Sequence, residues 1–267
     1  MGELDGKVVV ISGGAVGIGN GFARVFGAQG AAVAICDIRP EVDTVAGDLR
    51  LAGVDAVAWL ADVRDAAQVK RFVDEAAARF GGIDMLVANA GIWRPTLCAL
   101  DSWEKAVQDW DDVVNTNLRG VFLAGRAAIP HLIARGGGHI INVATDHICP
   151  PPGFATGGGT RMDVYDSSKF GINGLTGAWS KALKKHGIRV NALCMDATDS
   201  MMVRGAVGRS PTPEMLDLWM TPEQMAGLGL DLIREGPDGR SGENIGAWLS
   251  HEVKLPPVAT VLPSRHA

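Results

Sequence analysis

Short, nearly continuous apolar segments recur along this 267-residue chain and alternate with segments of helical pattern. Strands that read as continuous apolar runs are typical of parallel sheets buried on both faces. Their alternation with helices predicts an α/β fold, a doubly wound parallel sheet of about seven strands with right-handed crossovers and helices on both faces. The expected strands are Lys7–Ser12, Ala31–Asp37, Ala56–Val63, Ile83–Asn89, His139–Ala144, Ile188–Cys194 and Asn244–Leu249, and the expected helices are Gly19–Gln29, Asp65–Arg79, Asp111–Ala128 and Tyr165–His186.

The pattern runs through the chain without an internal linker or repeat, which predicts a single domain over residues 1–267. Two stretches, Cys149–Arg161 and Ser210–Pro222, are rich in Pro and Gly and are expected to be loops.

Composition excludes several function classes. The net charge is −5 and the sequence has no basic run, which argues against a nucleic-acid partner. The four cysteines are widely separated, so we expect neither a disulfide framework nor a metal site. The N-terminal residues lack the pattern of a signal peptide, and no apolar run is long enough to span a membrane. These features predict a soluble, cytoplasmic protein with no membrane partner.

A glycine-rich segment, Ser12–Gly19, follows the first expected strand and opens the first helix. Glycines let a backbone approach a pyrophosphate, and a helix N-terminus offers unpaired N–H groups and a positive dipole end. The spacing is G-x-x-x-G-x-G rather than the common G-x-G-x-x-G. In this strand–turn–helix context the segment predicts a dinucleotide site on a Rossmann-type sheet.

Asp37 ends the second expected strand, about twenty residues after the glycine turn. A carboxylate there accepts hydrogen bonds from the adenosine ribose hydroxyls and repels a 2′-phosphate. The glycine turn contains no Lys or Arg to bind such a phosphate, although Arg39 lies close to Asp37. These residues favour NAD as the cofactor, and an enzyme that uses NADPH is the alternative.

The single tyrosine of the chain, Tyr165, lies four residues before Lys169. Residues at i and i+4 of a helix share a face, so the phenol and the ammonium are expected to be neighbours. A free tyrosine titrates near about 10, and a nearby cation lowers that pKa. The pair therefore predicts a general acid/base.

Several segments together resemble the short-chain dehydrogenase/reductase family. They are the glycine turn SGGAVGIG at 12–19, ADV at 61–63, ANAG at 88–91, NTNL at 115–118, the Tyr165–Lys169 pair and RVNA at 189–192. The resemblance implies catalytic roles for Asn117, Tyr165 and Lys169, and adenine contacts for Asp62 and Val63. The full cofactor-binding set that it implies is Gly13, Gly17, Ile18, Gly19, Asp37, Asp62, Val63, Asn89, Gly91, Tyr165, Lys169 and Ser200.

Two segments depart from the family pattern. Thr145 stands where the family has a catalytic serine, and its hydroxyl can still donate to a substrate oxygen. Asp146 is the competing candidate, but a carboxylate would repel a developing alkoxide. Met195-Asp196 replaces the family's Pro-Gly, so Ser200 is taken as the nicotinamide contact, with Thr198 as the alternative.

The resemblance implies hydride transfer between a secondary alcohol and a nicotinamide cofactor, with Asn117, Thr145, Tyr165 and Lys169 at the reacting centre. Lys169 would hold the ribose hydroxyls and lower the pKa of Tyr165. Asn117 would anchor a water that links Lys169 to solvent. A dinucleotide-binding regulator without turnover is the alternative of a different class.

The substrate cleft is expected to be formed by insertions at about 146–163 and 196–222 together with Ile92–Trp103. An apolar lining predicts a small apolar alcohol or ketone, cyclic ones included, rather than a sugar. Small residues on the helix of Tyr165 (Gly171, Gly174, Gly177 and Ala178) favour a homo-oligomer, a tetramer or a dimer. The apolar side chains expected in the cleft are Trp93, Leu97, Leu100, Phe154, Met162, Met201, Met202, Val203, Trp219 and Met220.

Overall fold

Seven parallel strands form one sheet in the computed structural model, which describes residues 2–208, 210–249, 251 and 253–257. Their order in the sheet is β3-β2-β1-β4-β5-β6-β7, with the crossover between β1 and β4. All the strand positions expected from the sequence are confirmed, to within a few residues at the ends. The strands are β1 (Val8–Ser12), β2 (Ala32–Asp37), β3 (Ala56–Leu60), β4 (Met85–Ala88), β5 (Gly138–Val143), β6 (Ile188–Met195) and β7 (Asn244–Ala247).

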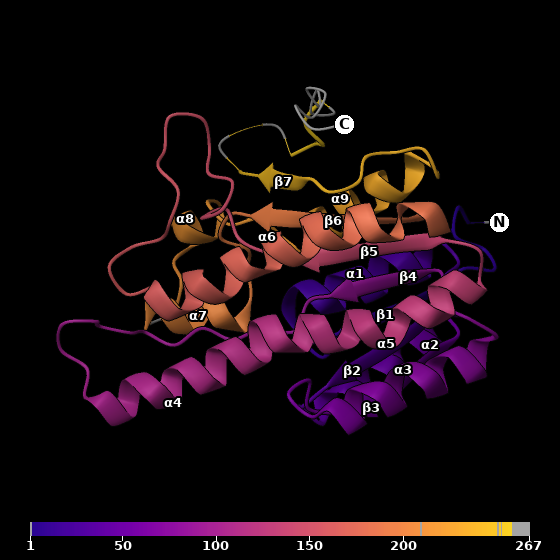
Figure 1. The fold of residues 1–267 in the computed structure, drawn as a ribbon, viewed down its shortest axis with the longest axis horizontal. Helices are drawn as coiled ribbons and strands as arrows, with labels where there is room; N and C mark the ends of the chain where they lie inside the picture. The colour runs from indigo at the N-terminus through magenta and orange to yellow at the C-terminus, as the bar shows by residue number, and fades with distance from the viewer. Residues whose placement is uncertain (1, 209, 250, 252, 258–267) are drawn as a thin grey trace.

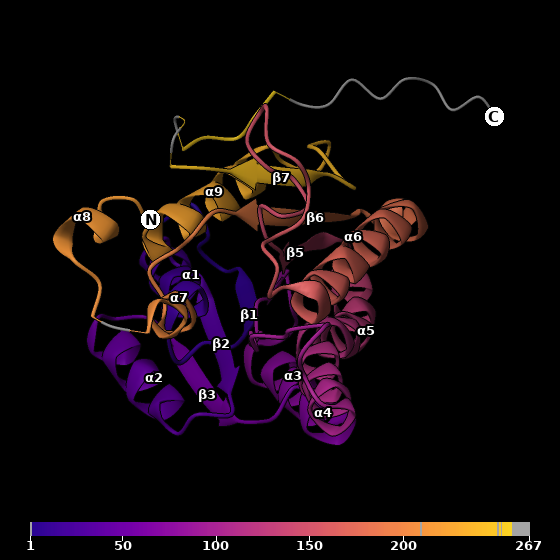
Figure 2. The same cartoon turned by 90° about the vertical axis from the view of Figure 1, so that its left-hand side faces the viewer.

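Helices cover both faces of the sheet (Figures 1 and 2). One face carries α1 (Gly17–Ala28), α2 (Glu41–Leu51) and α9 (Pro222–Arg234), and the other carries α3 (Ala66–Phe80), α5 (Gly120–Ala134) and α6 (Asp163–Leu183). A separate cluster of buried apolar side chains lies on each face. The doubly wound fold predicted from the alternating pattern is therefore confirmed.

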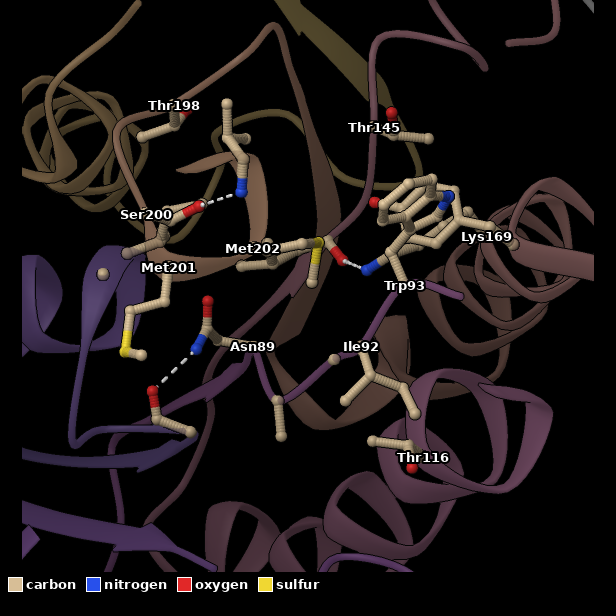
Figure 3. Close-up of a pocket in the computed structure, with 18 of the residues that line it drawn as sticks. Asn89, Ile92, Trp93, Thr116, Thr145, Lys169, Thr198, Ser200, Met201 and Met202 are labelled. Atoms are coloured by element: carbon tan, nitrogen blue, oxygen red, sulfur yellow. Dashed lines mark hydrogen bonds between the residues drawn. The ribbon is translucent and has the colours of Figure 1, made fainter. Parts of the chain in front are cut away.

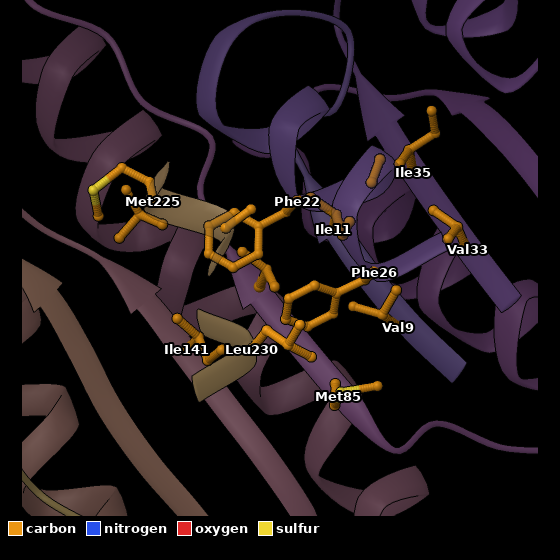
Figure 4. Close-up of a cluster of buried hydrophobic side chains, with 14 of the residues drawn as sticks. Val9, Ile11, Phe22, Phe26, Val33, Ile35, Met85, Ile141, Met225 and Leu230 are labelled. Atoms are coloured by element: carbon orange, nitrogen blue, oxygen red, sulfur yellow. The ribbon is translucent and has the colours of Figure 1, made fainter. Parts of the chain in front are cut away.

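The core beneath α1 is built around two phenylalanines (Figure 4). Phe22 and Phe26 are fully buried, and their rings meet edge to face at 5.3 Å between centroids. They pack among Ile11, Ile141 and Leu230. Burying each ring contributes roughly 1.5–3 kcal/mol. This packing fixes α1 against the sheet and thereby fixes the glycine turn that precedes it.

Several helical regions differ from the sequence prediction, and neither α7 (Met201–Val207) nor α9 was predicted. The helix expected at Asp111–Ala128 begins earlier, as α4 (Trp103–Val114), and passes through a π-helical turn (Asn115–Arg119) into α5. Helix α2 was not predicted, although Val42, Val45, Ala46 and Leu49 give it a buried stripe. The loop predicted at Ser210–Pro222 contains a short helix, α8 (Pro213–Leu216), and ends where Thr221 and Gln224 form a capping box that starts α9.

The loop expected at Cys149–Arg161 is confirmed as irregular and projects from the sheet as an exposed arm (Figures 1 and 2). Hydrogen bonds hold its two ends together. The Gly157 N–H donates to the His147 carbonyl at 2.8 Å, and the Gly158 N–H donates to the Asp166 carboxylate at 2.7 Å. Among the helices of the described residues, none is both long and apolar enough to cross a bilayer.

Candidate active site

A cleft of about 980 Å³ opens at the carboxyl ends of the central strands, which is where ligands bind in open α/β sheets. Figure 3 shows Thr145, Trp93 and Lys169 on one side of it and Thr198, Ser200 and Met201 on the other. Twelve of the fourteen predicted site residues contribute to its lining: Gly13, Gly17, Ile18, Asp37, Asp62, Val63, Asn89, Gly91, Thr145, Tyr165, Lys169 and Ser200. The other two, Gly19 and Asn117, lie directly behind it.

The glycine turn has the backbone that its sequence requires. Gly13 and Gly17 have φ angles of 72° and 57°, a region that side chains other than glycine rarely adopt. A Cβ at Gly19 would lie 2.1 Å from the Gly13 carbonyl oxygen, so this glycine serves close packing. Within the described chain, no side chain caps the N-terminus of α1 and its first turn holds no acidic residue. Its first N–H groups are therefore available to an anion.

One end of the cleft is lined by the carboxylates of Asp37 and Asp62 together with the guanidinium groups of Arg39 and Arg64. Asp37 is 8% exposed, and its carboxylate accepts hydrogen bonds from the Ala15 and Arg39 N–H groups, each at 3.0 Å. It thus ties β2 to the glycine turn. The Arg64 guanidinium binds Asp62 at 2.7 Å and lowers the pKa of that carboxyl. The sequence did not predict Arg64 as a lining residue, because its guanidinium is also held at 3.4 Å by Asp112 on α4, 48 positions away.

Asn89 and Asn117 organise the centre of the cleft. The Asn89 amide donates to the carbonyls of Ser12 and Gly13 at 3.0 and 2.9 Å, which joins the ends of β1 and β4 (Figure 3). Asn117 lies in the π-helical turn and is fully buried. Its amide accepts from the Ile92 N–H at 2.7 Å and donates to the Ile92 carbonyl at 2.9 Å.

Gly91 separates Asn117 from Lys169. A Cβ on Gly91 would lie 3.3 Å from the Asn117 Oδ1 and 3.5 Å from the Lys169 Nζ, so both groups approach the same point. Side chains at this position would crowd both polar groups. The structure therefore brings Asn117 and Lys169 together around a residue without a side chain.

Tyr165 and Lys169 lie one turn apart on α6 and share a face. The Lys169 Nζ is 5.8 Å from the centre of the Tyr165 ring and donates to the Val143 carbonyl at 2.9 Å (Figure 3). Lys169 is 3% exposed, and burial lowers its pKa to about 8. The carbonyl at the end of β5 thus fixes the ammonium beside the phenol, a contact that no sequence motif indicated.

The pKa of Tyr165 is shifted opposite to the sequence expectation. Burial raises it above its ordinary value, the Asp146 carboxylate adds to this, the Thr145 hydroxyl opposes it, and Asp166 raises it again. The Lys169 ammonium, 5.8 Å from the ring centre, does not overcome these effects. The physical reason is that burial of the phenol and the charges of two carboxylates favour the neutral phenol. The Lys169 ammonium favours the tyrosinate, but it donates its hydrogen bond to the Val143 carbonyl and its effect is smaller.

Thr145 and Asp146 follow β5 beside the phenol. The Thr145 hydroxyl donates to the Asp146 carboxylate at 3.2 Å and lies close enough to Tyr165 to affect its pKa. Burial raises the pKa of Asp146, and the nearby Asp196 carboxylate raises it further, whereas His147 lowers it. The hydroxyl and the phenol therefore face one region of the cleft, with a carboxylate behind the hydroxyl.

The segment after β6 returns to the glycine turn. Met195 ends β6, and the Asp196 N–H donates to the Ala247 carbonyl at 2.9 Å, so the backbone continues along β7 in place of the turn that Pro-Gly would make. Ser200 caps α7 (Met201–Val207) by accepting from the Val203 N–H at 3.3 Å. A Cβ on Gly17 would lie 3.2 Å from the Ser200 Cβ. Both Ser200 and Thr198 line the cleft.

The apolar lining is smaller than the sequence predicted. Trp93, Met162, Met201, Met202 and Val203 line the cleft as expected. The other five expected residues do not: Leu100 and Phe154 are 79% and 72% exposed, Met220 is buried in the core beneath α1, and Leu97 and Trp219 lie outside the lining. The arm carries Phe154 outward, and pairing of Met220 with Thr198 turns it into the core.

The pairing of His147 with Asp166 beside Tyr165 was not predicted from the sequence. The His147 Nδ1 is 2.5 Å from an Asp166 carboxylate oxygen, and the His147 ring meets the Tyr165 ring edge to face with centroids 6.0 Å apart. His147 also lines the cleft. The two residues are 19 positions apart, in different elements, so no local pattern could have paired them.

Comparison with known proteins agrees with this geometry. Residues 7–208 match the family described as short chain dehydrogenase. The chain belongs to the short chain dehydrogenase family. A family relative, the 2-dehydro-3-deoxy-D-gluconate 5-dehydrogenase of Escherichia coli K12, is 33% identical over 93% of this chain and 97% of its own. The cis-4-hydroxycyclohexanecarboxylate dehydrogenase of Sinomonas cyclohexanicum is 38% identical over 74% of this chain and 76% of its own.

The solved structures support the same fold. The crystal structure of levodione reductase superposes with a TM-score of 0.81 over 93% of this chain and 98% of its own, at 24% identity. Short chain dehydrogenases are oxidoreductases that use nicotinamide dinucleotides, and this chain is an oxidoreductase of that family.

The residues present fit such a dinucleotide. The positive-φ glycines, the uncapped N-terminus of α1 and the carboxylate of Asp37 line one continuous cleft that leads to Tyr165. A volume of about 980 Å³ lies at the upper end of the range for ligand pockets, which suits a large cofactor together with a substrate.

Proposed function

We propose that the protein is an NAD-dependent dehydrogenase that interconverts an apolar secondary alcohol, in particular a cyclic one, and its ketone. The observation that supports this best is that Tyr165, Lys169 and Thr145 line the same cleft as the glycine turn. When bound, the nicotinamide dinucleotide accepts hydride from the alcohol carbon or returns it to the ketone.

The chain's own residues divide the remaining work. Tyr165 takes the hydroxyl proton in oxidation and gives it back in reduction. Thr145 donates a hydrogen bond to the substrate oxygen after its hydroxyl turns from Asp146. Lys169 binds the ribose hydroxyls with its remaining donors, and Asn117 orients the Ile92 backbone and helps to place a water next to Lys169.

The proposed cofactor contacts follow the cleft from end to end. Asp37 takes the adenosine ribose, Asp62 and Val63 the adenine, and the glycine turn the pyrophosphate. Asn89, Gly91 and Ser200 are proposed to border the nicotinamide half, with Thr198 as the alternative to Ser200. All of these residues except Gly19, which packs the turn, line the cleft.

Asp37→Ala should relax the preference for NAD. The substitution removes the carboxylate that would repel a 2′-phosphate, and Arg39, which also lines the cleft, remains to attract it. We expect the NAD/NADP ratio of kcat/KM to fall by at least about tenfold, which corresponds to about 1.4 kcal/mol. Steady-state kinetics with both cofactors measure this ratio. A wild-type enzyme that prefers NADP would instead support the alternative of an NADPH-dependent carbonyl reductase.

The apolar side chains among the lining residues of the cleft support the substrate class. We propose that the chain is one domain in which residues 146–163 and 196–222 form the substrate site. Met162 and α7 contribute to this site, whereas the arm lies outside it. The Sinomonas relative, whose name describes a hydroxylated cyclohexane acid as its substrate, favours a cyclic alcohol. A screen of secondary alcohols with NAD, read at the nicotinamide absorbance, tests the function. No reduction of NAD or NADP with any alcohol would favour a non-catalytic dinucleotide-binding regulator.

Oxidation is expected to speed up at alkaline pH, and Asp146→Asn should move this rise to lower pH. Burial and the Asp146 charge raise the pKa of Tyr165, so the tyrosinate that accepts the proton forms only as pH increases. Asparagine at position 146 keeps an oxygen that accepts from the Thr145 hydroxyl, and it removes the negative charge. Because Tyr165 is the single tyrosine of the chain, tyrosinate absorbance reports its titration directly. An unchanged titration curve in this variant would contradict the argument.

We also propose a homo-oligomer. Trp103 and Trp110 on α4, Phe122 on α5 and Phe170 on α6 are 79%, 49%, 43% and 40% exposed. A Cβ at Gly174 or Gly177 would meet no atom of the described residues within 4 Å, whereas one at Gly171 would meet Leu118 at 2.6 Å. Gly171 therefore serves packing within the chain, and Gly174 and Gly177 leave room for a partner. Light scattering that gives a mass of 28.0 kDa would exclude an oligomer.

A further inference from the structure

The pair formed by His147 and Asp166 stands beside the proposed proton donor but has no part in the proposed hydride transfer. Both side chains are mostly buried, 20% and 19% exposed. Asp166 holds the imidazole with one carboxylate oxygen at 2.5 Å and the Gly158 N–H with the other at 2.7 Å. The imidazole is thus fixed by α6 and by the end of the arm.

The contact between His147 and Asp166 determines which imidazole nitrogen carries a hydrogen and which can accept a hydrogen bond. A carboxylate only accepts hydrogen bonds, so the His147 Nδ1 carries the hydrogen that bonds to Asp166. In the neutral imidazole the Nε2 is then left as an acceptor. A Cβ on Gly158 would lie 2.4 Å from the His147 Cε1 and 2.6 Å from its Nδ1, so backbone covers that edge of the ring. Because His147 lines the cleft, the part of its ring that Gly158 and Asp166 leave uncovered is available to a ligand.

The charges around the imidazole select the kind of ligand. Asp146 and Asp196 line the same part of the cleft, and Asp166 lies behind the ring. Asp146 and Asp166 both raise the pKa of Tyr165, and Asp196 lies close to Asp146, so the carboxylates here outnumber the Lys169 ammonium, which lies 5.8 Å from the Tyr165 ring. A carboxylate on the substrate would be repelled, whereas a neutral hydroxyl can donate to Nε2 without a charge penalty.

We propose that His147, held by Asp166, accepts a hydrogen bond from a second hydroxyl group of the substrate. The preferred substrate is then a diol or hydroxyketone on an apolar ring, with one oxygen at Tyr165 and the other at His147. This inference rests on the proposed function, since it assigns the substrate class of the same cleft. It also separates this chain from the two relatives, whose names describe acids as substrates.

The test compares cyclohexanol, the 1,2-, 1,3- and 1,4-cyclohexanediols and 4-hydroxycyclohexanecarboxylate in the wild-type protein and in His147→Leu. We expect the best diol to exceed cyclohexanol by about tenfold in kcat/KM in the wild type, the value of roughly one hydrogen bond. In His147→Leu this ratio should fall to about one, and the ratio cancels any loss of kcat/KM that cyclohexanol and the diol share. His147→Gln, which retains an acceptor near the Nε2 position, should keep part of the preference. His186→Leu is the matched control and should keep all of it.

The outcomes separate the two proposals. No turnover of any alcohol with NAD or NADP would overturn the proposed function and this inference with it. Turnover of cyclohexanol without a preference for a diol would overturn this inference alone. A diol preference that survives in His147→Leu, or a preference for the carboxylate substrate, would also overturn this inference. An equal loss of cyclohexanol and diol activity in His147→Leu would overturn it too, because it would indicate a purely structural role for His147.

Discussion

Tyr165→Phe is expected to reduce kcat for oxidation of a secondary alcohol by about a thousandfold or more while leaving cofactor affinity unchanged. Positioned proton transfer contributes on the order of 10²–10⁴ to rate, and the variant removes the proposed acceptor while keeping the ring. The ring still packs edge to face against His147 and beneath the Lys169 ammonium. The loss should therefore appear in kcat and not in the binding of NADH.

The measurements for this variant are single-turnover rates and NADH titration by fluorescence. The melting temperature provides the control, since loss of a single buried hydroxyl should change it by only a few degrees. A variant that keeps more than a tenth of the wild-type kcat would remove Tyr165 from the chemistry. A variant that no longer binds NADH would show that the phenol holds the cofactor instead.

Gly19→Ala has the second large expected effect, on the cofactor site and on stability together. The new Cβ would lie 2.1 Å from the Gly13 carbonyl oxygen and 2.6 Å from the Asn89 amide nitrogen. Backbone must therefore move, and it is the backbone that shapes the phosphate turn. We expect a stability loss of about 1–3 kcal/mol in urea unfolding. We also expect NADH affinity to fall by at least about tenfold, because the helix N-terminus shifts with the turn.

The same substitution in another helix provides the control. In Gly47→Ala the nearest atom to the new Cβ is the Arg50 Nη2 at 3.9 Å, so the methyl group fits. Alanine is favoured over glycine inside helices by about 1 kcal/mol, and this variant should gain stability while it binds NADH normally. If both variants bind NADH as the wild type does, the close packing of Gly19 against Gly13 is not what shapes the site.

Much of the site could be predicted because its residues lie at fixed places in a repeating pattern. The glycine turn follows the first strand, Asp37 ends the second, and Asn89 and Thr145 follow two further strands. In a parallel sheet all these strand ends meet at one edge, so residues far apart in sequence converge without any knowledge of side-chain contacts. The spacing of Tyr165 and Lys169 is likewise a property of a single helix.

The rest of the site depended on contacts that no local pattern contains. Phe154 and Met220 were expected in the cleft, but the arm turns one to solvent and the core takes the other. Arg64 lines the cleft, and its guanidinium is held by Asp112 on α4, 48 positions away, as well as by Asp62. In each case the direction of the side chain depended on parts of the chain far from it in sequence.

The periodicity of strands and helices determined the fold, because burial of regular elements depends on local spacing. The motifs in the turns and helices determined the family and most residues of the cleft. The tertiary structure alone decided the raised pKa of Tyr165 and the pairing of His147 with Asp166. Both are set by what surrounds a side chain in space: the loss of water around the phenol, and the meeting of two residues 19 positions apart on different elements.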